Sequence, residues 1–334
     1  MKTSTMDNPP MLSYREALNQ AMREEMRRDN RVLLIGEEVG YYQGAFKVSK
    51  GFVEEFGPQR VLDTPITEAG FTGLAIGAAM AGLRPIVELM TFNFGILALD
   101  QIVNNAAKIR YMSGGQLSVP IVIRGPGSAA HQLAAQHSQS LEAWFCHVPG
   151  LKVIAPATPH DAKGLLKSAV RDENPVIFIE AQLLYGTKGA VEEGDYTVPI
   201  GKADIKRQGR DVTIVAYSKM LLLALEAGKK LAGEGIDAEI VDLRTLKPLD
   251  IETIVTSVKK TGRLVTVEEG WHFAGLGAQI AESVYSRAFD YLDAPVVRVT
   301  GEEVPMPYTR PLEDAAIPDL ARVVTAVKRL LKRG

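Results

Sequence analysis

Short apolar runs rich in β-branched residues alternate with longer helical patterns along almost the whole chain, and this rhythm limits the folds that the chain can adopt. The runs lack the apolar–polar alternation of a strand with one wet face, so both faces of each predicted strand should be covered. Strands separated by helices pair in parallel, which predicts an α/β fold with doubly wound, mostly parallel sheets. The expected strands are 32–35, 86–89, 120–123, 151–154, 176–179, 212–216, 238–241, 264–268 and 296–299, and the expected helices are 14–28, 68–81, 94–111, 159–171, 221–232, 251–259, 277–287 and 320–331.

The segment 186–201 (GTKGAVEEGDYTVPIG) is rich in glycine and charge and has no sustained apolar period, which is typical of a connection. It separates about five strand–helix units from about four, and a chain of 334 residues is long enough for two domains of about 150 residues each. We therefore expect a first α/β domain over 1–186, a linker over 187–201 and a second α/β domain over 202–334.

Charge, cysteine count and hydropathy exclude several classes of protein. Thirty-eight basic residues stand against 40 acidic ones, and the net charge of −2 argues against a dominant nucleic-acid footprint. The single cysteine, Cys146, excludes an internal disulfide framework and a multi-cysteine zinc site. No stretch approaches the ~20 apolar residues of a membrane span. The first residues, MKTSTMDNPP, resemble neither a secretion signal nor an import signal, so we expect a cytoplasmic protein of a prokaryote, or an organelle-matrix protein if a transit peptide was removed.

The segment 63–94 (DTPITEAGFTGLAIGAAMAGLRPIVELMTFNF) is the most unusual in the chain. Pro65 and Thr67 favour the start of a helix, which puts Glu68 in its first turn, and small residues follow at three- and four-residue spacing. Such spacing lets another backbone approach closely, so we expect a tightly packed, largely buried helix with one carboxylate at its leading end. That carboxylate either complements the helix dipole or takes part in acid–base chemistry, and the residues alone leave both interpretations open.

Two further segments hold candidate site residues. The sequence GEEV (36–39) closes the first predicted strand, at the edge where α/β proteins bind ligands. Glu37 and Glu38 should point to opposite sides of an extended chain, so one would face a site and the other solvent, unless both lie in a solvated loop. His137 lies in a small-residue loop after the strand 120–123, where a structural histidine is more common than a catalytic one. The GPG at 125–127 indicates a turn and only a weak phosphate signal.

Five long segments of the chain together resemble one family. They are LIGEEVGYYQGAFKVSKGF, RVLDTPITEAGFTGLAIGAAMAGLRPIVELMTFNF, KIRYMSGGQ, AAQHSQSLEAWFCHVPGLKVIAP and RVTGEEVPMPY. They are similar to segments of the β subunits of thiamin diphosphate-dependent 2-oxo acid dehydrogenases, in the transketolase superfamily, and the likeness runs from about Leu12 to the final helix. The first segment and the MTFNF sequence favour the pyruvate dehydrogenase decarboxylating component within that family.

The resemblance implies a transketolase-type pyrimidine-binding domain followed by a transketolase C-terminal domain. It further implies an α2β2 heterotetramer, with each active site between an α and a β subunit, thiamin diphosphate shared by the two, and Mg²⁺ bound mainly by the α subunit. This chain has no Gly-Asp-Gly motif followed by Asn, the signature that binds Mg²⁺ and diphosphate, which agrees with such a division. The implied activity, present only together with an α subunit, is oxidative decarboxylation of pyruvate and reductive acetylation of lipoyl groups, which links glycolysis to acetyl-CoA synthesis.

The resemblance also assigns roles to residues of the site. Glu68 matches a glutamate that hydrogen-bonds a nitrogen of the aminopyrimidine ring, and Phe94 matches an aromatic residue that packs on that ring, with Met90 beside it. Glu37 matches a carboxylate that orders the site. His137 matches a histidine for proton transfer during acyl transfer to lipoamide. The partners implied are the α subunit and the subunit-binding and lipoyl domains of the dihydrolipoyl acetyltransferase, with the second domain providing dimer contacts and docking.

The family binds a monovalent cation, usually potassium, in this subunit. The matching ligands are the carbonyls of Ile121, Ala169, Val170 and Asn174 and the group at Asp172. Backbone carbonyls and one carboxylate suit a hard cation. The alternative is that RDENP (171–175) is simply a turn between a helix and a strand.

Two other functions stay open at this point. One is the same chemistry on branched-chain 2-oxo acids or acetoin, because residues of the α subunit help to select the substrate. The other is a non-catalytic α/β scaffold or regulatory subunit, against which Glu68, Phe94 and His137 argue. A self-contained transketolase-type enzyme is disfavoured, because such a chain needs its own diphosphate motif and is considerably longer.

Overall fold

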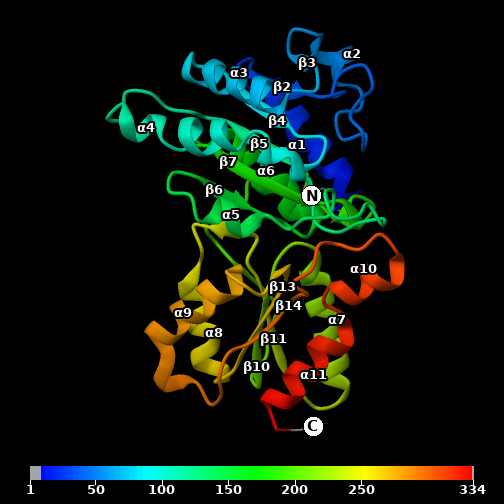
Figure 1. Ribbon diagram of the computed structural model, residues 1–334, viewed down its shortest axis with the longest axis vertical. Helices are drawn as coiled ribbons and strands as arrows, with labels where there is room; N and C mark the ends of the chain where they lie inside the picture. Colours follow the sequence, from blue (N-terminus) through cyan, green and yellow to red (C-terminus); the bar gives the residue numbers. More distant parts are fainter. Residues whose placement is uncertain (1–8, 333–334) are drawn as a thin grey trace, which may run out of the picture.

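The computed structural model describes residues 9–332 and contains two large sheets, one above the other in Figure 1. The upper sheet has seven strands in the order β12-β6-β7-β5-β4-β2-β3, and the lower sheet has five in the order β14-β13-β10-β11-β9. All neighbouring strands pair in parallel except the edge strands β12 and β9, which are antiparallel. The predicted α/β fold with mostly parallel sheets is confirmed.

The upper sheet is built almost entirely from the first half of the chain. Its last edge strand comes from the second half, where Thr245 pairs with Ile154, so the sheet itself joins the two halves. Its strands are β2 (Val32–Gly36), β3 (Val61–Asp63), β4 (Arg84–Glu88), β5 (Val122–Gly127), β6 (Lys152–Ile154), β7 (Val176–Ala181) and β12 (Thr245–Lys247).

Helices cover both faces of the upper sheet because its strands are apolar on both sides. Leu34 of β2 packs into a core with α1 and α6, while the next residue, Ile35, packs into a second core with α3 and η2. The long helices are α1 (Tyr14–Arg28), α3 (Glu68–Met80) and α6 (Pro159–Arg171). The shorter elements of this half are β1 (Met11–Ser13), α2 (Phe52–Phe56), η1 (Phe92–Ile96), η2 (Gln101–Ala106), α4 (Ile109–Met112), α5 (Glu142–Cys146), η3 (Gln182–Leu184) and β8 (Lys188–Ala190).

Helices α1 and α6 have the bounds that the sequence predicts, and local signals at their first turns explain why. Ser13 and Glu16 form a reciprocal capping box at the start of α1. Thr158 accepts a hydrogen bond from the backbone N–H of Asp161 at the start of α6, and Pro159 occupies the first turn of that helix.

The lower sheet is a five-stranded layer with α8 and α9 on its left and α7 and α11 on its right in Figure 1. The strands and helices predicted here are found to within a few residues, with β13 extending furthest beyond its predicted end, whereas β9, η4 and α10 were not predicted. The elements are β9 (Asp204–Arg207), β10 (Val212–Ala216), α7 (Lys219–Gly233), β11 (Ala238–Asp242), α8 (Ile251–Thr261), β13 (Leu264–Trp271), α9 (Leu276–Ala288), η4 (Phe289–Tyr291), β14 (Val297–Gly301), α10 (Arg310–Ala316) and α11 (Leu320–Leu330). Among residues 9–332, no helix combines the length and the apolar character that crossing a bilayer requires.

The single helix predicted over 94–111 is wrong, because the chain forms η1, the π-helical η2 and α4 in its place. Ala98, Ile102 and Ala106 are all buried and lie four residues apart. This spacing is equally typical of an α-helix, so it does not by itself select the π turn, which is marked by the hydrogen bond from the N–H of Ala107 to the carbonyl of Ile102, five residues earlier.

The turn predicted at 125–127 is also wrong, because these residues end strand β5. A Cβ atom on Gly125 would lie 2.4 Å from the carbonyl oxygen of Leu89, so the neighbouring backbone leaves room only for glycine. Pairing with β4 stops at Arg124, so the missing N–H of Pro126 leaves no gap in that ladder.

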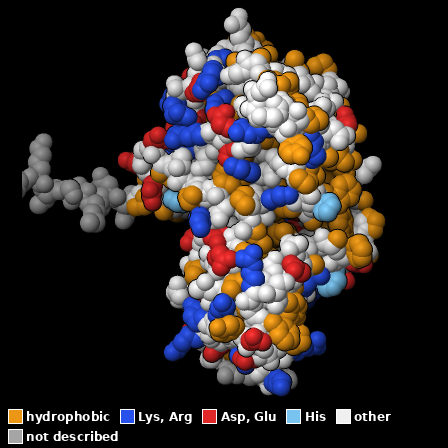
Figure 2. Space-filling model, turned by 90° about the vertical axis from the view of Figure 1, so that its left-hand side faces the viewer, with side chains coloured by type: hydrophobic (Ala, Val, Ile, Leu, Met, Phe, Trp, Pro, Cys, Tyr) orange, Lys and Arg blue, Asp and Glu red, His pale blue; other side chains and the backbone are white. Residues whose placement is uncertain are grey.

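Helix α3 is less buried than expected. Its small-residue face, with Gly70, Leu74 and Gly77, is exposed, and a Cβ on Gly77 would meet nothing within 4 Å. When the molecule is turned by 90° about the vertical axis, apolar side chains gather along its right-hand edge (Figure 2). Exposed apolar surface of this kind is typical of chains that bury it against a partner.

A fully buried charge cluster lies within the upper sheet. Arg124 of β5 forms ion pairs with Glu88 of β4 and Glu180 of β7, and Tyr185 donates a hydrogen bond to Glu180 at 2.6 Å. The two carboxylates raise the pKa of Arg124 against the opposing effect of burial, so the guanidinium stays charged. Removing one member would leave a buried charge without its partner.

Candidate functional site

The predicted site residues follow four neighbouring strands of the upper sheet. Strands β5, β4, β2 and β3 lie side by side and run in the same direction, so their carboxyl ends meet at one edge. Glu37 follows β2, Met90 follows β4, and His137 lies in the connection after β5. Glu68 begins α3, five residues after the end of β3. This is the edge at which open α/β sheets bind ligands.

Glu37 and Glu68 form a pair of buried carboxyl groups, each only 5% exposed. Burial, together with the charge of Glu68, raises the pKa of Glu37 to about 7. Among residues 9–332, Oε1 of Glu37 has no hydrogen-bond partner, and no side-chain hydrogen bond to Glu68 is found. The neighbour Glu38 is exposed and lies in a turn with a φ of 58°, so the extended chain on which the predicted alternation depends ends at Gly36. Two adjacent carboxyl groups with free acceptor atoms can hold and transfer a proton at a polar ligand.

Phe94 and His137 form a second pair. Their rings meet edge to face, with centroids 5.1 Å apart and an interplanar angle of 80°. Phe94 is half-buried in η1, which is anchored by the buried Phe92 through an edge contact with Phe145. His137 is exposed, and Met90 is half-buried just before η1. Within residues 9–332, no hydrogen bond or ring contact joins this pair to the two carboxyl groups.

Sequence reasoning missed Asn93, although it connects these parts of the site. This buried side chain accepts a hydrogen bond from the backbone N–H of Gln139 at 2.9 Å and donates one to Thr91 at 2.6 Å. It thereby ties η1 to the connection that carries His137. A polar residue between two phenylalanines was the available signal, because buried polar groups need partners.

The predicted cation ligands lie together where α6 meets β5 and β7. The carbonyl of Ile121 accepts a hydrogen bond from Val176, and that of Ala169 accepts one from Asp172. Arg84 donates to the carbonyls of Val170 and Asp172 at 3.0 and 3.2 Å. The carboxylate of Asp172 forms an ion pair with Lys152. It also accepts hydrogen bonds from the backbone N–H and the side-chain amide of Asn174, both at 2.9 Å.

These hydrogen bonds leave the predicted ligand oxygens able to bind potassium. A carbonyl oxygen has two lone pairs, so one hydrogen bond leaves it able to coordinate a cation. The oxygen donors therefore fit a hard cation in kind, and Arg84 and Lys152 are the positive groups with which it would compete.

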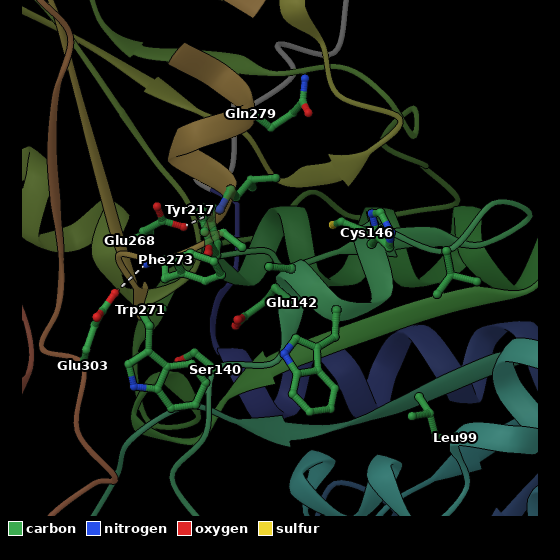
Figure 3. Close-up of a pocket in the computed structure, with 18 of the residues that line it drawn as sticks. Leu99, Ser140, Glu142, Cys146, Tyr217, Glu268, Trp271, Phe273, Gln279 and Glu303 are labelled. Carbon is green, nitrogen blue, oxygen red and sulfur yellow. Dashed lines mark hydrogen bonds between the residues drawn. The ribbon is translucent and has the colours of Figure 1, made fainter. Parts of the chain in front are cut away.

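A cavity with a volume of about 980 Å³ lies between the two sheets. Its lining comes from both halves of the chain, including Glu142 and Cys146 of α5 and Trp271 and Phe273 at the end of β13 (Figure 3). Burial raises the pKa of Glu142 to about 7 and that of the Cys146 thiol to about 12. None of the predicted site residues lines this cavity, so it is separate from the carboxylate pair.

Comparison with known proteins assigns both halves of the chain. The model of the transketolase pyrimidine-binding domain matches residues 10–188, and that of the transketolase C-terminal domain matches residues 201–323. The "Pyruvate dehydrogenase E1 component subunit beta" of Rickettsia bellii is 57% identical over 319 residues, which cover 96% of this chain and 98% of that protein. The chain belongs to this family. The mitochondrial protein of the same name from Caenorhabditis elegans is 57% identical, over 96% of this chain and 92% of that protein.

A solved structure also resembles this β subunit. The chain titled "Split gene transketolase, inactive beta4 tetramer" aligns with a TM-score of 0.77 and 27% identity, over 96% of this chain and 98% of that one. The resemblance drawn from the sequence, to the β subunits of the pyruvate dehydrogenase component, is confirmed.

Proposed function

We propose that this β subunit supplies the pocket for the aminopyrimidine ring of thiamin diphosphate in a pyruvate dehydrogenase component. The observation that carries the proposal is the buried pair of Glu37 and Glu68 at the carboxyl edge of a pyrimidine-binding domain. Oε1 of Glu37 is buried and without a partner among residues 9–332, so the site suits a polar heterocycle. Phe94 would pack on that ring and Met90 would lie beside it.

The chemistry requires a proton at a ring nitrogen of the pyrimidine. When bound, thiamin diphosphate supplies a thiazolium that accepts the electrons released as pyruvate loses CO₂. Glu68 would transfer the proton at the ring nitrogen, which a carboxyl group can do and an amide cannot. Because its pKa is about 7, Glu37 would be largely protonated below neutral pH and would place little negative charge beside Glu68. It would also orient the carboxyl group of Glu68.

An α subunit would complete the site. This chain lacks the Gly-Asp-Gly motif followed by Asn, so Mg²⁺ and the diphosphate need ligands from another polypeptide. The exposed small-residue face of α3, with Gly70 and Gly77, offers a surface on which a second backbone can pack closely. These features support an α2β2 assembly that is active only with the α subunit.

His137 would act in the second half of the reaction, the acetylation of a lipoyl group. Its exposed imidazole can reach a substrate that another protein carries to the site, and Phe94 supports the ring from one side. We assign it the donation of a proton to the lipoyl sulfur as the acetyl group transfers. Docking of the acetyltransferase on the second domain stays a prediction.

We also propose potassium at the carbonyls of Ile121, Ala169, Val170 and Asn174 with the group at Asp172. A cation there would tie the end of α6 to β5 and β7 and so support the core of the upper sheet. Thermal unfolding of the assembled enzyme in potassium and sodium salts of equal ionic strength tests this. A higher midpoint in potassium supports the site, and equal midpoints would leave RDENP as an ordinary turn.

Reconstitution with an α subunit tests the proposed function as a whole. The chain should co-purify with an α chain when both are expressed, and the complex should decarboxylate pyruvate only when thiamin diphosphate and Mg²⁺ are present. Pyruvate should be preferred over 2-oxoisovalerate and acetoin. A stable complex without this activity would favour the scaffold interpretation, and a preference for 2-oxoisovalerate would identify a branched-chain enzyme. The compartment, bacterial cytoplasm or organelle matrix, stays a prediction.

A further inference from the structure

The segment 128–140 (the His137 loop) has a strained backbone. Four residues that are not glycine have positive φ angles: 68° at Ser128, 53° at His131, 57° at Gln132 and 63° at Ala134. Each such conformation is unfavourable for a residue with a Cβ atom and persists only where contacts hold it in place. Contacts with the second half of the chain hold this loop in place.

Two charged side chains from the second half of the chain bind the backbone N–H and carbonyl of one residue, Ala129, near the start of the loop. Lys219, the first residue of α7, donates from Nζ to the carbonyl oxygen of Ala129 at 2.6 Å. Glu269 of β13 accepts a hydrogen bond from the N–H of Ala129 at 2.5 Å and forms an ion pair with Lys219. Both polar groups of Ala129 are thus bound by one pair of opposite charges.

Two further contacts extend this grip along the loop. Glu313 of α10 accepts a hydrogen bond from the N–H of Gln132 at 3.0 Å. The hydroxyl of Ser140, at the far end, donates to the same Oε1 atom of Glu269 at 3.3 Å. The second half of the chain therefore holds the start, the strained middle and the end of the loop.

These groups are buried, and their burial argues against a role in stability alone. The side chains of Lys219 and Glu269 are only 8% and 7% exposed, and Glu313 is 8% exposed. Buried ion pairs rarely add more stability than apolar side chains of the same volume would, because each charge loses its hydration. Burial lowers the pKa of Lys219 to about 8 while Glu313 and Glu142 raise it, so its ammonium form still dominates at neutral pH.

We propose that Lys219, Glu269 and Glu313 are positioning residues through which the second domain fixes the His137 loop. They contact no reacting atom; they set the backbone from which His137 meets the edge of Phe94. The inference rests on the proposed role of His137 in acyl transfer. It gives the second domain a direct part in the acetylation step.

The test uses the α2β2 enzyme with Glu313→Ala, which removes the acceptor for Gln132, and Glu313→Gln, which keeps one. Asp314→Ala is the matched control, because Asp314 is the next residue of α10 and is exposed. Hydrogen exchange of the backbone amides at 128–140 should speed up about 10-fold in Glu313→Ala, from the loss of one charge-assisted hydrogen bond. Glu313→Gln should restore most of the protection, and Asp314→Ala should match the parent enzyme.

Lys219→Met and Lys219→Arg test the main contact in the same assembly. Lys219→Met should lower lipoamide acetylation about 10-fold more than decarboxylation measured with an artificial electron acceptor, with faster exchange over 128–140. Lys219→Arg should recover part of the lipoamide acetylation rate and part of the protection from exchange over 128–140. Unchanged exchange in both Lys219→Met and Glu313→Ala would overturn the proposal. Failure of His137→Ala to affect acetylation would instead refute the role of His137, while the exchange measurement would still decide whether the second domain holds the loop.

Discussion

Replacing Glu37 by glutamine should stabilise the folded protein at neutral and alkaline pH. The pKa of Glu37 rises from 4.5 to about 7 in the folded state, which corresponds to on the order of 3 kcal/mol. Because the folded protein binds more protons than the unfolded chain between these values, the contribution of Glu37 to stability is fully present below pH 4.5. It is lost as the pH rises through 7. Glutamine imitates the protonated form at every pH, so Glu37→Gln should escape this loss.

Urea denaturation between pH 5 and 8.5 measures the effect, with Glu38→Gln as the matched control because Glu38 is the exposed neighbour. The difference in unfolding free energy between the two variants should grow with pH and approach on the order of 3 kcal/mol above pH 7.5. A difference that does not change with pH would refute the argument, because it would mean that Glu37 is ionised throughout and is not desolvated.

The remaining predictions concern the core and the His137 loop. Arg124→Met strands two buried carboxylates, so urea denaturation should show a loss of about 3–5 kcal/mol, and a loss below about 1 kcal/mol would mean that the carboxylates take up protons at little cost. Gly125→Ala places a Cβ 2.4 Å from the carbonyl of Leu89 and should cost about 1–3 kcal/mol in thermal unfolding, unless β4 and β5 can separate. His137→Ala should retain decarboxylation with an artificial acceptor and lose lipoamide acetylation; equal loss of both would indicate a general defect.

Local signals explain which parts of the fold the sequence predicts. Helix α1 starts at a capping box of Ser13 and Glu16, and β10 is a short run rich in β-branched residues, so both have the predicted bounds. The segment after Phe94 has the same helical composition, yet it folds into a 3-10 turn, a π turn and a short α-helix. Pro126 and its flanking glycines suggest a turn, but parallel pairing with β7 makes them part of a strand.

Some features of the candidate site could be predicted from the sequence and others could not. Glu37 could be placed at the ligand-binding edge of the sheet because it follows a predicted strand, whereas β3, the strand that precedes Glu68, was not predicted. The contact of Lys219 and Glu269 with Ala129 could not be predicted, since these residues are separated by up to 140 positions and belong to different halves of the chain. Only the docking of one domain on the other brings them together. The exposed face of α3 was misjudged for a related reason, because its small residues are suited to a surface outside this chain.

The rate of the assembled enzyme with Glu68→Gln tests the central claim most directly. Glutamine retains the size of the side chain and its ability to hydrogen-bond but cannot transfer a proton, so pyruvate decarboxylation should fall by at least ~100-fold while the α2β2 complex still forms. Glu38→Gln, measured in parallel, should stay near the parent rate. A Glu68→Gln enzyme with a near-parental rate would contradict the account, because the buried acid would then have no part in the chemistry.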